Sequence, residues 1–478
     1  MRGEEGRGRM VEGRRRGFTE ASTTKLWYSL FILPFLLAYA VWRWFAVVAE
    51  SLIFIVFRYV PTFHHTHWLW YVAAAFLYGW YIFFSVGIGG CLVVAAWLWR
   101  RKDVQKKMRD YPTASFIVPA YNEESRIPRC ITSLFKCAAV YPAPSEVIVI
   151  DDGSTDLTYE AACTTVEMNR KQWPHVKGRI IRHTANLGRA EAVHTGVTVA
   201  TREVVCVVDA DSWWEPTALS ELVKSMGIDE RIAATGYIHP TDGEKEKNVL
   251  IIFQQQEYSQ ALAVFRCAQA LGGAVFIVPG AIGLQRADKL RDVLDERNIH
   301  SVTEDLETTL QMQKKGFDVG YSKRAHSKTV APTSLNAFWN QRLRWFMGGL
   351  HNILGIHRDM LFKRRWTSLF LWYSLLVEYG GALIELLTLC GLPLLFWFAP
   401  DRTFFIYNAV MFLVFVVIVG TIHQAIALKF AYGQPNHKRL LLYTPFYIVM
   451  RFLNVFARCT SLLKYAMGYK GTWHKTKT

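Results

Sequence analysis

Residues 204–212 read Val-Val-Cys-Val-Val-Asp-Ala-Asp-Ser, and this stretch decides the fold of the central part of the chain. Residues 204–208 form a continuous apolar and mostly β-branched run, as expected for a strand that is buried on both faces of a parallel sheet. Asp209 and Asp211 follow at its carboxyl end, where ligands bind in open α/β sheets. Two carboxylates at this spacing can share a divalent cation with a phosphate group. The alternative is an ordinary turn, because acidic residues after strands are common turn formers.

The composition indicates that much of the chain lies in lipid. Of 478 residues, 51% are hydrophobic, with 17 Trp, 21 Tyr and 30 Phe. A helix needs about 20 apolar residues to cross a bilayer. Apolar stretches of at least this length are found at 26–57, 69–98, 366–398, 404–428 and 441–463. The sequence therefore predicts a multi-pass membrane protein.

The net charge of +16 does not indicate a nucleic-acid partner, because the basic residues concentrate at the edges of the apolar stretches. Basic residues lie at 14–16 and 25, before the first stretch, and at 100–102, after the second. In multi-pass proteins such residues mark the cytoplasmic side. We therefore expect an even number of crossings between these flanks, most simply two, and a cytoplasmic domain after residue 102. The expected location is the plasma membrane.

From residue 102 to about 332, short β-branched runs alternate with helical stretches. This alternation is typical of an α/β domain with a mostly parallel sheet. The domain is inserted between the transmembrane helices. The predicted boundaries are a basic cytoplasmic tail at 1–25, an N-terminal transmembrane region at 26–99, the α/β domain at 100–332, amphipathic interface helices at 333–365, and a C-terminal transmembrane region with a short basic tail at 366–478.

Two further predicted strands lead into polar loops. The strand at 114–118 precedes the loop Pro119–Glu124, which opens a helix at Ser125 and forms a natural nucleotide site. The strand at 146–150 is followed by Asp151 and Asp152. One of these carboxylates can accept a hydrogen bond from a pyrimidine imide while the other orders the loop. The alternative is an ordinary turn with a helix cap.

A third strand, at 180–183, leads into a turn that carries Arg189. A basic side chain on such a turn can contact a diphosphate. Elsewhere, the polar run Gln254–Tyr258 is expected to form a polar helix face. Charged or polar residues within the C-terminal apolar stretches are costly in lipid and should face protein or a wet cavity; they are Glu378, Glu385, Arg451, Asn454 and Arg458.

Six motifs come in the order found in family 2 glycosyltransferases. They are Val118-Pro119-Ala120-Tyr121-Asn122-Glu123, Asp151-Asp152-Gly153-Ser154, Asn186-Leu187-Gly188-Arg189-Ala190, Asp209-Ala210-Asp211, Thr303-Glu304-Asp305 and Gln341-Arg342-Leu343-Arg344-Trp345. The last two resemble motifs of the membrane-embedded processive synthases of cellulose, hyaluronan, chitin and poly-N-acetylglucosamine. The resemblance covers about residues 114–349 and implies a GT-A-like glycosyltransferase domain. Arg189 departs from the family, which more often has Lys there, so the geometry of its phosphate contact is open.

The resemblance also implies roles for individual residues. Asp211 would be the direct ligand of Mg²⁺ or Mn²⁺, and Asp209 would assist the metal or hold the donor. Asp305 fits the general base that takes the proton of the acceptor hydroxyl. The alternative is a helix start, in which Thr303 caps the helix and the acidic residues favour its first turn. The implied donor-binding residues are Tyr121, Glu123, Asp151, Asp152, Arg189, Asp209, Gln341 and Arg344, and the implied acceptor-binding residues are Glu304 and Trp345.

The segment 335–350 is predicted to be an amphipathic helix on the membrane surface. Its residues Gln341, Arg344 and Trp345 share one face at i, i+3 and i+4. Such a face can present a guanidinium to the diphosphate and an indole to an acceptor sugar. The alternative is a Trp and an Arg that anchor the helix at headgroup level.

The resemblance and the single candidate base imply an inverting, processive hexosyltransferase that extends a β-linked polysaccharide from a UDP-sugar. The polar groups in the C-terminal apolar stretches could line an export path for the product, and the alternative is structural pairing between helices. The expected partners are the UDP-sugar, the growing polysaccharide and the lipid bilayer, with no nucleic acid; the oligomeric state stays open. One alternative is a non-processive family 2 enzyme that adds one sugar to a membrane lipid carrier. An alternative of another class is a membrane transporter or channel with a nucleotide-binding domain.

Overall fold

The computed structural model describes residues 82–102, 110–227, 231–243, 248–295, 301–363, 365–397, 402–431 and 437–469. The predicted basic tail at 1–25, most of the N-terminal transmembrane region and residues 470–478 lie outside the described residues. The domain boundaries given above therefore stay predictions. The chain divides into two compact units, here described separately. The larger one comprises residues 95–392 and 420–469, and the smaller one comprises residues 82–94 and 393–419.

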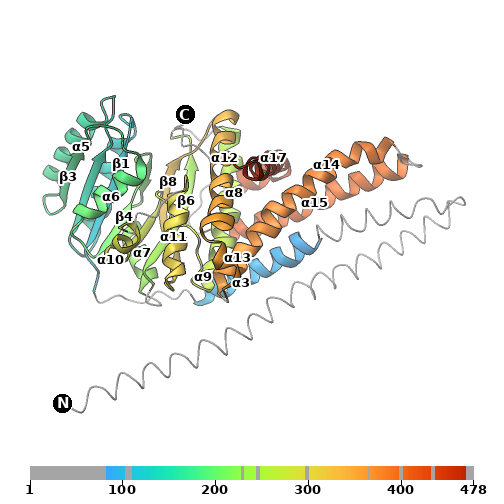
Figure 1. Ribbon diagram of the computed structural model, residues 1–478, viewed down its shortest axis with the longest axis horizontal. Coiled ribbons are helices and arrows are strands. Elements are labelled where there is room, and N and C mark those ends of the chain that lie inside the picture. The colour runs from blue at the N-terminus through green and yellow to red at the C-terminus, as the bar shows by residue number, and fades with distance from the viewer. Residues whose placement is uncertain are drawn as a thin grey trace, which may run out of the picture. The chain divides into compact units, whose positions relative to one another are not determined.

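A mixed sheet lies at the centre of the larger unit (Figure 1). Within the described residues it has eight strands in the order β3-β2-β1-β4-β7-β6-β8-β5. The strands are β1 (Ala114–Ala120), β2 (Ser145–Asp151), β3 (Lys177–Arg182), β4 (Val204–Val207), β5 (Ser212–Trp214), β6 (Ala233–Thr241), β7 (Gly283–Arg286) and β8 (Val319–Val330). All four predicted strands are confirmed within a few residues. The prediction of a mostly parallel sheet is confirmed, because the pairs β1–β2, β1–β4, β2–β3 and β6–β8 are parallel. The sheet is mixed because β7 runs antiparallel to β4 and β6, and β5 runs antiparallel to β8.

Side chains of the parallel strands alternate between two cores, one on each face of the sheet. In β1, Phe116 and Val118 belong to one core while Ile117 belongs to the other. In β2, Val149 and Ile150 divide in the same way. This follows from the two-residue period of a strand, and it explains why these strands are apolar throughout.

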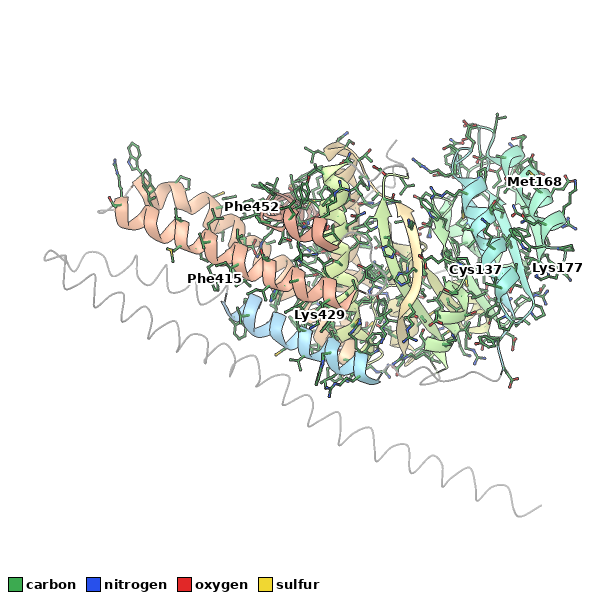
Figure 2. All side chains as sticks on the ribbon, turned by 180° about the vertical axis from the view of Figure 1, so that it is seen from behind. Cys137, Met168, Lys177, Phe415, Lys429 and Phe452 are labelled. Carbon is green, nitrogen blue, oxygen red and sulfur yellow. The ribbon has the colours of Figure 1, made fainter. Side chains whose placement is uncertain are left out.

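Helices cover both faces of the sheet (Figure 1). They include α4 (Ile127–Val140), α5 (Thr158–Gln172), α6 (Arg189–Val199), α7 (Ala218–Met226), α10 (Ala287–Leu294) and α11 (Glu304–Lys314). The helix after β1 begins at Ile127, two residues later than predicted. Cys137 of α4 is fully buried against the sheet, whereas Met168 of α5 and Lys177 of β3 are exposed at the sheet edge (Figure 2).

The described residues contain a further set of helices, some of which belong to the apolar segments. They are η2 (Ile82–Ile88), α3 (Gly89–Lys102), α8 (Val249–Gln260), η3 (Ala261–Phe265), α9 (Arg266–Leu271), α12 (Leu335–Leu350), η4 (His351–Ile356), η5 (Arg358–Phe362), α13 (Trp366–Tyr373), η6 (Ser374–Gly380), α14 (Gly381–Trp397), α15 (Arg402–Phe430), α16 (His437–Tyr443), η7 (Thr444–Phe446) and α17 (Tyr447–Ala466). The predicted helix at 335–350 is confirmed as α12. Figure 1 shows α8 and α12 side by side, and the Arg342 guanidinium of α12 donates to Glu257 of α8 at 2.8 Å.

Three helical stretches among the described residues are long and apolar enough to cross a membrane: Trp366–Gly391, Ala409–Phe430 and Arg439–Ala466. They correspond to the three predicted C-terminal apolar stretches. Some of the polar groups within them contact other helices, as expected. Arg451 of α17 pairs with Glu385 of α14, its Nε lying 2.9 Å from the Glu385 Oε2, and Asn454 Nδ2 lies 3.5 Å from the Glu257 Oε1.

Candidate active site

The loops after β1 and β2 are tied to each other by backbone and side-chain hydrogen bonds. The Asn122 N–H donates to Ser154 Oγ at 3.0 Å, and the Thr155 N–H donates to Asn122 Oδ1 at 2.9 Å. Asn122 has a φ of 54°, in the left-handed region that Asn tolerates better than most residues. The predicted donor residues Tyr121 and Glu123 flank Asn122, so this pairing fixes the loop that carries them.

Asp151 and Asp152 have different partners. Asp152 accepts hydrogen bonds from the backbone N–H groups of Leu187 at 3.0 Å and Gly188 at 2.8 Å, and its Oδ1 lies 2.8 Å from His183 Nδ1. Asp152 is thus the carboxylate that orders a loop, namely the turn just before Arg189. Asp151 is fully buried, and its Oδ2 lies 3.1 Å from the Nε of Arg182. A contact of Asp151 with a pyrimidine stays a prediction.

Arg189, the first residue of α6, joins two motifs that are far apart in the chain. Its Nε and Nη2 donate to Asp209 Oδ1 at 3.2 and 2.6 Å, and its Nη1 donates to Glu304 Oε1. Burial alone would lower the pKa of Arg189, but the carboxylates of Asp209 and Glu304 raise it above its usual value. Arg189 is therefore a fixed cation between the end of β4 and the start of α11.

Gly280 closes one side of this ion pair. A Cβ at this position would lie 2.4 Å from Asp209 Oδ1 and 2.3 Å from Arg189 Nη2, so no other residue fits without moving them. The Asp209 N–H also donates to the Gly280 carbonyl at 2.8 Å. The close approach of this backbone holds the Asp209 carboxylate at the site.

Asp211 lies beside further negative charge. Burial, Asp209 and Glu123 together raise the pKa of Asp211 to about 7. Its Oδ1 has the hydroxyls of Ser212 at 3.2 Å and Thr329 at 3.4 Å. Such a carboxylate pair is electrostatically suited to a divalent cation, which would relieve the repulsion.

The donor set also fits Mg²⁺ or Mn²⁺. In the described part of the chain, no group of three or more His, Cys, Asp or Glu side chains could hold a metal alone. Mg²⁺ that acts on phosphates is usually held by one or two carboxylates, with the substrate phosphates and water completing its shell. Asp211 and Asp209 supply that number of protein ligands.

Asp305 lies in the first turn of α11, next to Glu304. Burial and the charge of Glu304 raise the pKa of Asp305 to about 6, and Arg189 opposes this shift. Its Oδ1 accepts a hydrogen bond from the Leu306 N–H at 2.8 Å. A carboxyl with this pKa is ionised near neutral pH yet basic enough to accept a proton.

The alternative of a helix start is confirmed in part: acidic residues occupy the first turn of α11, but the Thr303 side chain does not cap it. Thr303 occupies the N-cap position, but its hydroxyl accepts no hydrogen bond from the first turn. Instead, Thr303 Oγ1 accepts from Asn352 Nδ2 at 3.1 Å and lies 3.0 Å from Ser301 Oγ. The start of α11 is therefore attached to η4, the continuation of α12.

Gln341, Arg344 and Trp345 lie on α12 as predicted, and all three are partly buried. The Gln341 Oε1 is buried without a hydrogen-bond partner among the described residues. Trp345 has a neighbour that sequence reasoning missed. The guanidinium of Arg342 lies 4.6 Å from the ring centroids of both Phe338 and Trp345.

The polar run 254–258 lies on α8 as predicted, but it is buried at two positions and partly buried at the other three. Gln254 and Gln256 are fully buried, and Glu257 receives a hydrogen bond from Arg342, which is only 3% exposed. The sequence contained an indication of this arrangement, because polar side chains that are buried in an apolar helix need hydrogen-bond partners. Arg342 within the α12 motif supplies one of them.

Residues 115–294, which include most of the strands and Arg189, Asp209 and Asp211, match the model described as glycosyl transferase family 2. This match and the mixed sheet confirm the predicted α/β fold of the GT-A type.

Curated relatives point in the same direction. The chain is 27% identical over 241 residues to a poly-β-1,6-N-acetyl-D-glucosamine synthase of Staphylococcus epidermidis. The matched region covers 50% of this chain and 55% of that protein. It is 27% identical over 265 residues to the enzyme of the same name from Staphylococcus aureus strain COL, covering 55% of this chain and 60% of the relative. The chain thus matches little more than half the length of these relatives.

Among solved structures, a mannosyltransferase from Pyrobaculum calidifontis in complex with GDP-Man and Mn²⁺ is similar at 18% identity and a TM-score of 0.49. The similarity covers 78% of this chain and 95% of that one.

Proposed function

We propose that this protein is an inverting glycosyltransferase that extends a β-linked polysaccharide from a UDP-sugar at a membrane. The observation that carries the proposal is the contact of Arg189 with both Asp209 and Glu304. It brings the Asp-Ala-Asp motif at 209–211 next to the Thr-Glu-Asp motif at 303–305. A donor diphosphate and an acceptor hydroxyl can therefore meet between them.

Each side chain has one role in this reaction. Arg189 binds the donor diphosphate. Asp211 and Asp209 would hold a divalent cation, which would supply Lewis-acid stabilisation of the departing diphosphate. Asp305 accepts the proton of the acceptor hydroxyl as its oxygen bonds to the anomeric carbon. The bond from that carbon to the diphosphate oxygen breaks, and UDP leaves with the electron pair. A single displacement of this kind inverts the anomeric carbon.

The polymer product is proposed because of α12. Trp345 would stack on the acceptor sugar, while Gln341 and Arg344 would face the donor. The two named relatives synthesise a polymer of N-acetylglucosamine, so UDP-N-acetylglucosamine is the first donor to test. The three apolar helices support a membrane location, and the basic flanks support a plasma-membrane protein with a cytoplasmic catalytic domain.

The test is a comparison of single UDP-sugars with the purified full-length chain in lipid vesicles with Mg²⁺ or Mn²⁺. Released UDP and the size of the product are both measured. UDP release with a long polymer supports the proposal, whereas one sugar on an organic-soluble lipid would show the non-processive alternative. Nucleotide binding without UDP release from any donor would contradict enzymatic transfer and favour the transporter. The variant Asp305→Asn tests the proposed base in the same assay. Its control is Asp295→Asn, which changes an exposed carboxylate at the end of α10.

A further inference from the structure

The start of α11 and the end of α12 meet at a buried asparagine. Asn352 is fully buried, and its Nδ2 lies 2.8 Å from Ser301 Oγ, 3.1 Å from Thr303 Oγ1 and 3.0 Å from the Gly348 carbonyl, so its two N–H groups are shared among three acceptors. The carbonyl only accepts, so it fixes which end of the amide faces it. Asn352 therefore binds both the residue preceding Glu304 and the last turn of α12. Figure 1 shows α11 and α12 next to each other.

The residue before α11 and the last turn of α12 are in close contact. A Cβ at Gly348 would lie 2.4 Å from Thr303 Oγ1 and 2.5 Å from Thr303 Cγ2. The spacing between α11 and α12 is thus set by the packing of the Thr303 side chain against the backbone of Gly348, which has no side chain. The hydrogen bond of Asn352 holds the Thr303 hydroxyl in that position.

The first turn of α11 is stabilised by contacts with residues that precede the helix. The Thr303 hydroxyl does not cap it, and the Ser301 N–H donates to Glu307 Oε2 at 2.7 Å. Two residues after Thr303 stands Asp305, and on α12 Trp345 lies one turn before Gly348. The same contact therefore determines how far the Asp305 carboxylate stands from the Trp345 ring.

We propose that Asn352 is a positioning residue that fixes Asp305 relative to Trp345, and with it the reach of the base to the acceptor hydroxyl. This inference rests on the proposed function. A misplacement of a reacting group by about 1 Å can reduce a rate by about 100-fold.

Arg189 and Asp209, which hold the donor diphosphate in the proposed function, have no hydrogen bond with Asn352. Gln341 and Arg344 lie about two turns or more before Asn352 along the helix, so donor affinity should change little.

The test uses the full chain in lipid vesicles with its active UDP-sugar. Asn352→Ala is compared with Asn336→Ala, which changes the same residue type on an exposed face of α12. Three quantities are measured: UDP affinity in the presence of Mn²⁺, the rate of transfer to the acceptor, and the rate of donor hydrolysis by water. We expect Asn352→Ala to lower transfer about tenfold or more with UDP affinity and hydrolysis within about twofold. Asn336→Ala should match the wild type.

Partner variants separate positioning from folding. Thr303→Ser keeps the hydroxyl that Asn352 binds and should retain most of the transfer rate. Thr303→Val keeps the shape but loses the acceptor, so it should lower transfer as Asn352→Ala does. Because both changes remove one contact, the combination of Thr303→Val with Asn352→Ala should fall no further than either alone.

Several results would overturn the inference. Equal transfer by Asn352→Ala and the wild type would show that the contact does not position the base. A parallel loss of UDP affinity, hydrolysis and transfer would show that Asn352 only supports folding, and additive losses in the double variant would show separate roles. If the wild type itself transferred no sugar, the proposed function would fail first and the role of Asn352 with it.

Discussion

Replacing Asp305 by Asn tests the proposed base most directly. The amide keeps the size of the carboxyl but cannot accept a proton, so transfer should fall by about 10² to 10⁴-fold. UDP affinity should stay nearly unchanged, because the donor contacts come from Arg189 and Asp209. Isothermal titration with UDP and a metal ion measures the binding, and radiolabelled sugar incorporation measures the transfer.

The pH dependence of the wild type gives a second measure of the same group. With a pKa of about 6, Asp305 is about nine-tenths ionised at pH 7 and about one-tenth ionised at pH 5. Transfer should therefore fall about tenfold over this interval if Asp305 is the base. The residual activity of Asp305→Asn should lack this acidic limb.

Stability should move in the opposite direction to activity. The pKa of Asp305 is raised from 3.8 to about 6 in the folded protein, so its ionised form is disfavoured there relative to the unfolded chain. The contribution of protonated Asp305 to the free energy of unfolding is fully present below about pH 4 and is lost as the pH rises through about 6. Asp305→Asn should thus be more stable than the wild type at pH 7, by at most about 3 kcal/mol.

Polymer synthesis retained by Asp305→Asn, or an acidic limb unchanged in its pH profile, would refute the role of Asp305 as the base.

Three other substitutions have distinct expected outcomes. Asp211→Ala should abolish transfer and weaken UDP binding only when metal is present, and activity that survives a chelator would contradict a metal role. Gly280→Ala should displace the Asp209 carboxylate and lower donor affinity about tenfold or more with the melting temperature little changed, measured by titration and thermal unfolding. Glu257→Gln should leave the guanidinium of Arg342 buried without its charge partner and destabilise the fold by about 3 to 5 kcal/mol, whereas an unchanged unfolding free energy would show that water or lipid headgroups compensate.

The parallel half of the sheet could be predicted because its strands have strong local signals. β1, β2 and β4 are apolar runs of the length of a strand, each followed by polar residues. The other half could not be predicted in the same way. β6 contains a Gly and a Pro, β8 contains several charged residues, and β5 has only 3 residues. These strands exist because they pair with one another, a contact between distant segments that local propensity does not encode.

The sequence indicates candidate residues for the site, but it does not indicate the contacts between them. The sequence separates Arg189 from Glu304 by 115 positions, and no local pattern indicates that they pair. Likewise, Thr303 has every local feature of a helix cap, yet its hydroxyl binds Asn352 of η4. In that case a tertiary partner of better geometry replaced the local one.

Burial is the largest cause of the raised pKa values of Asp211 and Asp305, and neighbouring carboxylates add to both shifts. Asp209 raises the pKa of both groups, and Arg189 opposes the shift of Asp305. A divalent cation held by Asp211 and Asp209 would add positive charge near both carboxyls and therefore lower both pKa values. The acidic limb of the wild-type profile should thus lie at or below pH 6, and it should be recorded at a saturating metal concentration. Otherwise the loss of metal by protonation of Asp211 would reduce the rate at a higher pH, and it would be mistaken for protonation of the base.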